Sequence, residues 1–273
     1  MTTVETGTIL DKIVARTRAD VIQRAAARPI AEIETEAAEQ TLPLSLERAL
    51  RQPGVSIIAE IKRASPSRGR FPVEIVPDRV AADYAAGGAA AISVLTDAPF
   101  FQGSLDDMRA AAAVVHRPPY GLPVLRKDFI VDRYQIVEAR AAGADAILLI
   151  VAVLDDPTLH EFLDAAHVLG MDALVETHDE LEMARARALG ATIIGINNRD
   201  LKTFAIDLGT TERLAPLAPP DAVLVAESGI FGAAEMERVK QAGASAVLVG
   251  EGLIVQPDRA AAVRALRESA ADA

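Results

Sequence analysis

Ionisable side chains close several otherwise apolar segments of this 273-residue chain. Glu60 and Lys62 end the first such segment, Lys127 ends a second, and Glu176 lies near the end of a third. Amines and carboxylates that meet in one place can exchange protons with a substrate when burial and neighbouring charges tune their pKa values. The pattern therefore predicts an acid–base site. A structural Glu–Lys ion pair and solvated loop charges are the alternatives.

The first segment, VSIIAEIK (55–62), shows how the charges must point. Side chains of a strand alternate between its faces, so Glu60 and Lys62 share a face with Ile58. The opposite face is entirely aliphatic and suits packing beneath helices. Glu60 and Lys62 are therefore expected to point inward, where two charges cost free energy unless they pair or serve a ligand.

A repeat reveals the elements that position these residues. Four segments combine a helix end at Gly-Ala with an apolar strand: AGGAAAISVLT (86–96), AAGADAILLIV (141–151), ALGATIIGINN (188–198) and QAGASAVLVGE (241–251). Glycine suits the position after a helix because it takes positive φ without steric cost. Further apolar runs at 55–62, 122–129, 171–178 and 222–229 bring the total to eight strands alternating with helices. This α/β pattern predicts a single (β/α)8 TIM barrel, with an open doubly wound sheet as the alternative.

The segment before the first strand, about residues 1–50, is expected to be a helical extension with apolar Ile9, Ile13, Val14 and Ile22. It holds too little apolar material to fold alone. We therefore treat residues 1–273 as a single barrel domain, and we expect the extension to cover the barrel mouth.

Strand ends meet at one edge of a barrel, so the residues there are expected to build one site. Asn197 can orient a hydroxyl or carbonyl group. Glycines follow the seventh and eighth strands, at Gly229 and at Gly250 and Gly252, where barrels often bind phosphate. A short helix that begins near Gly252 would add its N-terminal dipole.

The composition excludes several other classes of function. The chain has no cysteine, which excludes disulfides and thiolate catalysis, and its net charge of −11 argues against a nucleic-acid surface. The start shows no signal peptide, and the longest apolar run is too short to span a membrane, so we expect a soluble cytoplasmic protein. The sequence also contains no Walker loop and no HExxH motif, and we expect no metal site.

Seven ordered motifs together resemble the indole-3-glycerol phosphate synthase family over nearly the whole chain from about residue 45. They are EIKRASPS (60–67), SVLTD (93–97), LRKDFI (125–130), LVETH (174–178), GINNRDL (195–201), AESGI (226–230) and VGEGLI (249–254). The resemblance implies a single barrel without an organic cofactor. It also implies a carboxy-lyase of tryptophan biosynthesis that closes the pyrrole ring of 1-(2-carboxyphenylamino)-1-deoxyribulose 5-phosphate, releasing CO2 and water.

By the same resemblance, Lys127 is the general acid of ring closure and Glu176 the general base of dehydration. Lys62 holds the substrate carboxylate, and Glu60 and Asn197 position groups around the reacting centre. The expected binding residues fall into three groups: supporting residues Ser65, Arg199, Glu227 and Ser228; phosphate-binding Gly229, Gly250 and Glu251; and a pocket for the aromatic ring formed by Phe101, Phe129, Leu148 and Leu201.

Three expectations complete the prediction. Lys127 would need a lowered pKa to exchange protons near neutrality, with Lys62 and Arg126 as candidate causes. Glu251 would repel phosphate unless its side chain turns away. The partner is a small sugar phosphate with an anthranilate moiety, bound by a monomer or weak homo-oligomer.

Two alternative functions remain open. One is another phosphate-binding barrel isomerase or lyase, although phosphoribosylanthranilate isomerase uses a cysteine that this chain lacks. The other is a catalytically inactive barrel that acts as a binding subunit. That hypothesis predicts the loss of key strand-end residues, and those residues are all present.

Overall fold

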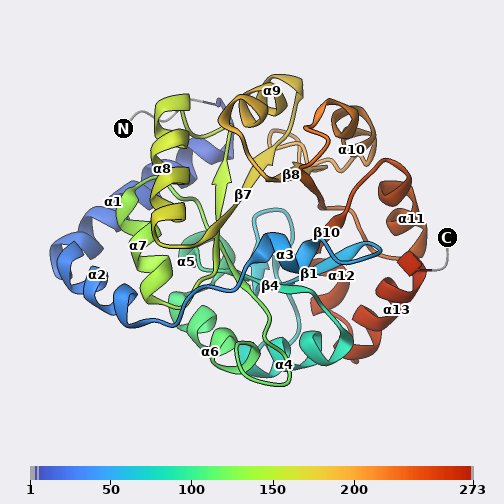
Figure 1. Ribbon diagram of the computed structural model, residues 1–273, viewed down its shortest axis with the longest axis horizontal. Coiled ribbons are helices and arrows are strands. Elements are labelled where there is room, and N and C mark those ends of the chain that lie inside the picture. Colours follow the sequence, from blue (N-terminus) through green and yellow to red (C-terminus); the bar gives the residue numbers. More distant parts are fainter. Residues whose placement is uncertain (1–3, 5, 272–273) are drawn as a thin grey trace.

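The computed structural model describes residue 4 and residues 6–271. Within them, eight parallel strands close into a barrel in the order β1-β10-β9-β8-β7-β6-β5-β4 (Figure 1). The closed order confirms the (β/α)8 prediction over the open sheet. The barrel strands are β1 (Ser56–Ile61), β4 (Ala91–Leu95), β5 (Val124–Lys127), β6 (Ala146–Ile150), β7 (Asp172–Thr177), β8 (Ile193–Asn197), β9 (Val223–Glu227) and β10 (Ala246–Val249). A small hairpin of β2 (Ala64–Ser65) and β3 (Gly69–Arg70) follows β1.

Helices surround the barrel and bury the outer faces of its strands. They are α4 (Pro77–Gly87), α5 (Ala98–Phe101), α6 (Leu105–Val115), α7 (Arg133–Ala141), α8 (Asp156–Val168), α9 (Glu180–Leu189), α10 (Gly209–Leu214), the 3₁₀ turn η1 (Ala215–Leu217), α11 (Ala233–Gln241), α12 (Glu251–Ile254) and α13 (Arg259–Ala271). Strands such as β6, which is buried throughout, are apolar on both faces because side chains fill the barrel and helices cover it.

Helix starts follow the sequence signals closely. Asp132, Asp155 and Asp179 each accept a hydrogen bond from a backbone N–H in the first turn of α7, α8 and α9. Such side chains satisfy donors that the helix itself leaves unpaired. Gly88 and Gly190 end α4 and α9 in the left-handed conformation that the Gly-Ala repeat predicts.

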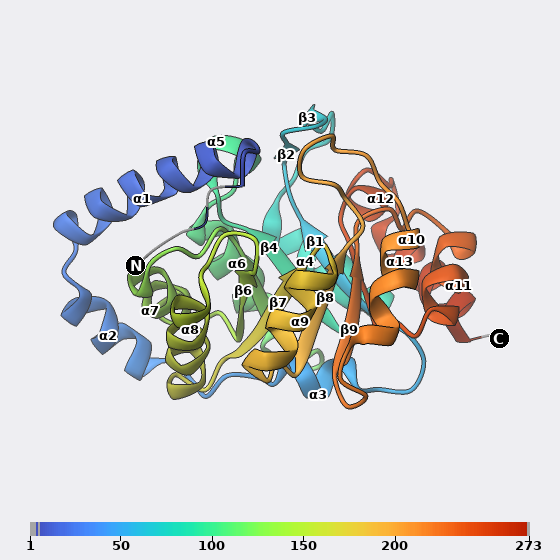
Figure 2. The same ribbon diagram turned by 90° about the horizontal axis from the view of Figure 1, so that it is seen from above.

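The N-terminal extension forms α1 (Ile9–Ala27), α2 (Ile30–Glu39) and α3 (Leu46–Leu50). Figure 2 shows α1 at the same end of the barrel as the β2–β3 hairpin, with α3 at the opposite end. Of the apolar residues named in the extension, Ile13 and Val14 are buried, whereas Ile22 is 70% exposed. Its neighbour Val21 is buried instead and packs in a small cluster with Ile33 of α2 and Val137 of α7.

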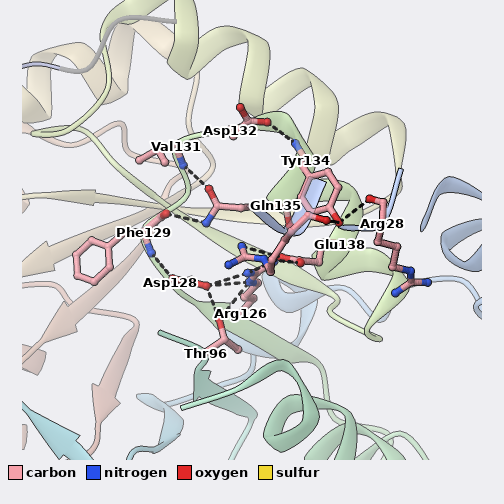
Figure 3. Close-up of polar contacts among 11 residues, drawn as sticks. Arg28, Thr96, Arg126, Asp128, Phe129, Val131, Asp132, Tyr134, Gln135 and Glu138 are labelled. Carbon is pink, nitrogen blue, oxygen red and sulfur yellow. Dashed lines mark hydrogen bonds and ion pairs between the residues drawn. The ribbon is translucent and has the colours of Figure 1, made fainter. Parts of the chain in front are cut away.

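A buried charge cluster ties β5 to α7 and to the extension (Figure 3). The Arg126 guanidinium, only 1% exposed, lies 2.8 Å from Asp128 and 3.0 Å from Glu138. It also donates to the carbonyl of Gln135 at 2.7 Å and to the Thr96 hydroxyl at 3.1 Å. Glu138 in turn accepts a hydrogen bond from Arg24 of α1. Arg126 thus points away from the barrel mouth.

Arg126→Met is expected to lower the free energy of unfolding by about 3–5 kcal/mol. The substitution keeps much of the side-chain length but leaves Asp128 and Glu138 buried beside each other without their shared cation. Urea denaturation followed by circular dichroism measures the loss. Arg109→Met is the matched control, because Arg109 pairs with Asp106 on the exposed surface and should lose less than about 1 kcal/mol. Equal losses for both variants would refute a special role for the buried cluster.

Candidate active site

The carboxyl ends of the barrel strands open into one cavity. The five predicted catalytic residues and the eleven predicted binding residues all line it. Ile9, Leu10 and Ile13 of α1 also line the cavity, so the extension reaches the barrel mouth as expected. The sequence therefore identified residues that the fold brings together, while the role of each remains a prediction.

Lys127 lies between two carboxylates at the centre of the cavity. Its ammonium nitrogen is 3.0 Å from Oε2 of Glu176 and 3.3 Å from Oε2 of Glu227. The Asn197 amide donates to Oε1 of Glu176 at 3.2 Å, and Lys62 pairs with Glu60 at 2.7 Å. The charged side chains of β1, β5, β7 and β9 thus meet inside the barrel, because alternate residues of each strand point inward.

The surrounding groups shift the pKa values of Glu176 and Glu227 in opposite directions. Burial alone would raise the pKa of Glu176, but Lys127 and His178 hold it well below its ordinary value. Burial raises the pKa of Glu227 to about 8, with support from nearby Glu176 and against the pull of Lys127. At neutral pH the site therefore holds one ionised and one largely protonated carboxyl group, a division typical of acid–base pairs.

The expectation that Lys127 has a lowered pKa is wrong. Burial does act in that direction, but Glu176, Glu227 and Glu60 outweigh it and hold the pKa of Lys127 above its ordinary value. Arg126 instead pairs with Asp128 and Glu138. Lys127 is therefore held in its protonated, cationic form.

Two glycines make room for these side chains. A Cβ atom at Gly250 would lie 2.3 Å from Oε1 of Glu60 and 2.6 Å from the nitrogen of Lys62. A Cβ atom at Gly195 would lie 2.2 Å from Oε1 of Glu227. Larger residues at either position would displace the charged groups. Gly195 was not predicted as a site residue, although it stands inside the GINNRDL motif.

The late strand ends form a second, glycine-rich part of the cavity. Ser228 and Gly229 both line the cavity and both adopt positive φ, +66° and +86°. Gly250 caps α12, whose start at Glu251 agrees with the expected short helix. The Glu251 carboxylate lies 3.1 Å from Arg68 of the hairpin loop, so a cation balances its charge. Arg199 is half buried nearby. Burial lowers the pKa of its guanidinium, and the negative charge of Glu251 acts in the opposite direction.

Part of the cavity wall is apolar. The rings of Phe101 and Phe129 lie 6.1 Å apart at 39°, and Leu148, Leu201 and the start of α1 complete the wall. Aromatic and aliphatic side chains of this kind favour a flat aromatic group. Asp97 holds Phe101 in place by accepting hydrogen bonds from the backbone of Phe100 and Phe101.

Sequence reasoning missed His178, which directly follows β7. Its Nε2 lies 3.2 Å from Oε1 of Glu176, and its Nδ1 lies 2.9 Å from Glu182. The LVETH motif contained the signal, because residues 176 and 178 share a face by strand alternation. Within the described residues, no group of three or more His, Asp or Glu is arranged to hold a metal ion. None of the helices in this described part of the chain is long and apolar enough to cross a membrane.

A closed (β/α)8 barrel with an acid–base cluster at its strand ends defines an enzyme of the TIM-barrel class. The family model "Indole-3-glycerol phosphate synthase" matches residues 10–266. Curated relatives of that name include one from Nocardioides sp., 52% identical over 94% of this chain and 96% of its own length. Another, from Mycolicibacterium smegmatis, is 50% identical over 94% of this chain and 92% of its own length. The chain belongs to the indole-3-glycerol phosphate synthase family, and it is a lyase of tryptophan biosynthesis.

Solved structures agree on the fold. Thiamine phosphate pyrophosphorylase from Pyrococcus furiosus superposes with a TM-score of 0.61 at 16% identity, covering 84% of this chain and 98% of its own. A 3-hexulose-6-phosphate synthase superposes with a TM-score of 0.60 at 20% identity, covering 79% of this chain and 99% of its own. At such low identity these similarities concern the barrel architecture alone.

Proposed function

We propose that this enzyme is a carboxy-lyase that converts 1-(2-carboxyphenylamino)-1-deoxyribulose 5-phosphate into indole-3-glycerol phosphate. A carbon–carbon bond forms between the carboxylate-bearing ring carbon and the ribulose carbonyl carbon, whose oxygen takes up a proton. Loss of CO2 then restores the aromatic ring, and loss of water completes the pyrrole ring. Membership in the family supports this proposal, and so does a site that holds acidic, basic, apolar and glycine-rich parts in one cavity.

The shape of the cavity suggests how the substrate lies. The anthranilate ring packs against Phe101 and Phe129, while the phosphate reaches the backbone at Gly229 and Gly250. This places the carboxylate and the carbonyl near Lys62 and Lys127 between the two ends. Arg68 and Arg199 offset the carboxylate of Glu251, which would otherwise oppose an anion at that end.

The charges suggest the division of labour. Lys127, held protonated by its carboxylate neighbours, donates to the developing alkoxide during ring closure. Glu176, held ionised, removes a proton during dehydration. Glu60 and Asn197 orient Lys62 and Glu176 through the contacts described above. Glu227, with a pKa of about 8, supplies a protonated carboxyl group beside Lys127.

The observation that carries this proposal is the position of Lys127 between Glu176 and Glu227 inside a cavity with an aromatic wall. The decisive experiment follows the fluorescence of indole-3-glycerol phosphate after the purified protein is mixed with the carboxyphenylamino-deoxyribulose phosphate. Turnover supports the lyase. Binding without turnover would favour the inactive-subunit alternative, and turnover of a different sugar phosphate would favour another barrel isomerase or lyase.

Turnover is expected to continue unchanged in buffer that contains excess EDTA. The acid–base groups named above supply every proton transfer of the proposed reaction, so no step calls for a metal ion or an organic cofactor. Steady-state rates with and without the chelator measure this. Loss of activity that a divalent cation restores would contradict the cofactor-free mechanism.

We also propose that the enzyme works in the cytoplasm as a monomer or weak homo-oligomer, without nucleic-acid partners. The net charge of −11 supports the last point, because phosphate backbones repel a strongly acidic surface. Sedimentation at micromolar concentrations tests the assembly state.

A further inference from the structure

His178 occupies an unusual position between two carboxylates. It follows β7 and is 13% exposed at its side chain. Nδ1 forms a hydrogen bond with Oε2 of Glu182 in α9 at 2.9 Å, while the buried Nε2 lies 3.2 Å from Oε1 of Glu176 in an ion-pair contact without hydrogen-bond alignment. The two ring nitrogens therefore face opposite ways, one toward the cavity cluster and one toward the surrounding helix layer.

This geometry favours the doubly protonated ring. A neutral imidazole carries one lone pair, which would face a carboxylate oxygen at either nitrogen. Burial opposes the charged form, but the contacts with Glu176 and Glu182 outweigh it and raise the pKa of His178 to about 10. His178 is thus a second cation beside Glu176, on the side opposite Lys127.

Glu182 contacts the His178 ring, but the start of α9 does not depend on this contact. Its Oε2 also accepts the backbone N–H of His178 at 2.8 Å, and its own N–H donates to Asp179, the N-cap of α9. The α9 start is therefore capped by groups other than the imidazole. The ring contributes something beyond helix capping, and its remaining partner is Glu176.

We propose that His178 is a positioning residue whose charge keeps Glu176 ionised after Lys127 has given its proton to the substrate. This inference rests on the proposed function. When Lys127 becomes neutral, Glu176 loses its nearest cation while Glu227 and Glu60 remain close by. A buried carboxylate in that situation takes up a proton, and it would then fail as the base of the dehydration step. The imidazolium of His178 prevents this because it gives up no proton to the substrate.

The first test compares His178→Asn with the wild type across pH. Asparagine retains a polar side chain but carries no charge. Once Lys127 is neutral and the imidazolium is gone, no adjacent cation offsets the burial of Glu176, and its pKa should rise to neutrality or above, as burial does for Glu227. We therefore expect the ratio of kcat at pH 6 to kcat at pH 8 to fall about tenfold. The acid limb moves to higher pH, since the base works only when deprotonated, while KM changes little.

The matched control is His160→Asn, which replaces an exposed histidine of α8. Its pH profile should equal that of the wild type. A merely structural role for His178 predicts a lower Tm with an unshifted profile, and that result would overturn the inference. Absence of turnover in the wild type itself would instead count against the proposed function, which keeps the two failures apart.

A second measurement needs no folded His178 variant. In ¹⁵N-histidine-labelled wild type, nuclear magnetic resonance should show the ring of His178 doubly protonated from pH 6 to pH 9, consistent with a pKa of about 10. Glu182→Gln, which removes one facing carboxylate, should lower that titration point. A ring that is neutral at pH 7 in the wild type would refute the inference directly.

Discussion

Lys127→Met is expected to lower kcat by about 10²- to 10⁴-fold, the usual contribution of a positioned general acid. Methionine retains much of the side-chain volume but carries no proton to donate. The substrate still finds the aromatic wall, Lys62 and the glycine-rich end, so KM should change far less than kcat. Rapid-quench or steady-state fluorescence of the indole product measures both constants.

The same variant tests the electrostatics of the cluster. Without Lys127, Glu176 and Glu227 face each other with no cation between them, and the two are expected to share one proton. Lys202→Met, a substitution of an exposed lysine in the loop after β8, is the control and should leave kcat unchanged. A Lys127→Met protein that melts earlier but turns over at nearly the wild-type rate would show that Lys127 is a structural ion-pair partner.

The sequence predicts much of this architecture because barrel strands impose a strict alternation. Because one face of VSIIAEIK is aliphatic and packs beneath helices, Glu60 and Lys62 must point into the barrel. In the structure they form an ion pair at the barrel mouth. The Gly-Ala repeat likewise located the helix ends at Gly88 and Gly190. Strand alternation and helix ends depend on residues only a few positions apart, so both can be predicted from a single sequence.

The errors concern interactions between distant segments. Arg126 precedes Lys127, and alternation alone implies that it faces outward, yet its pairing with Glu138 depends on how α7 packs beside β5. The direction of the Lys127 pKa shift depends on three carboxylates contributed by three other strands. Ile22 was named only as an apolar residue of the extension, and it is exposed because packing against α2 and α7 buries Val21 instead.

Glu176→Gln is expected to reduce kcat by about 10²- to 10⁴-fold through loss of the general base. Glutamine has the same shape and still contacts Lys127, Asn197 and His178, so the fold should persist, although Tm should fall because the two cations lose a buried counter-charge. The proton that Glu176 would remove during dehydration then has no strong acceptor nearby. Intermediate formed by ring closure and CO2 loss is expected to accumulate, and single-turnover product analysis measures it.

The pH profile gives this variant a second, independent signature. Glu176 raises the pKa of Lys127, so activity that needs protonated Lys127 is retained as pH rises until that pKa is reached. Removing the carboxylate lowers the pKa of Lys127, and the alkaline limb of the residual activity should therefore move to lower pH. Glu161→Gln, on the exposed side of α8, provides the control and should shift neither limb. If Glu176→Gln keeps kcat within about fivefold of the wild type with an unmoved alkaline limb, Glu176 is neither the base nor the group that sets the charge of Lys127.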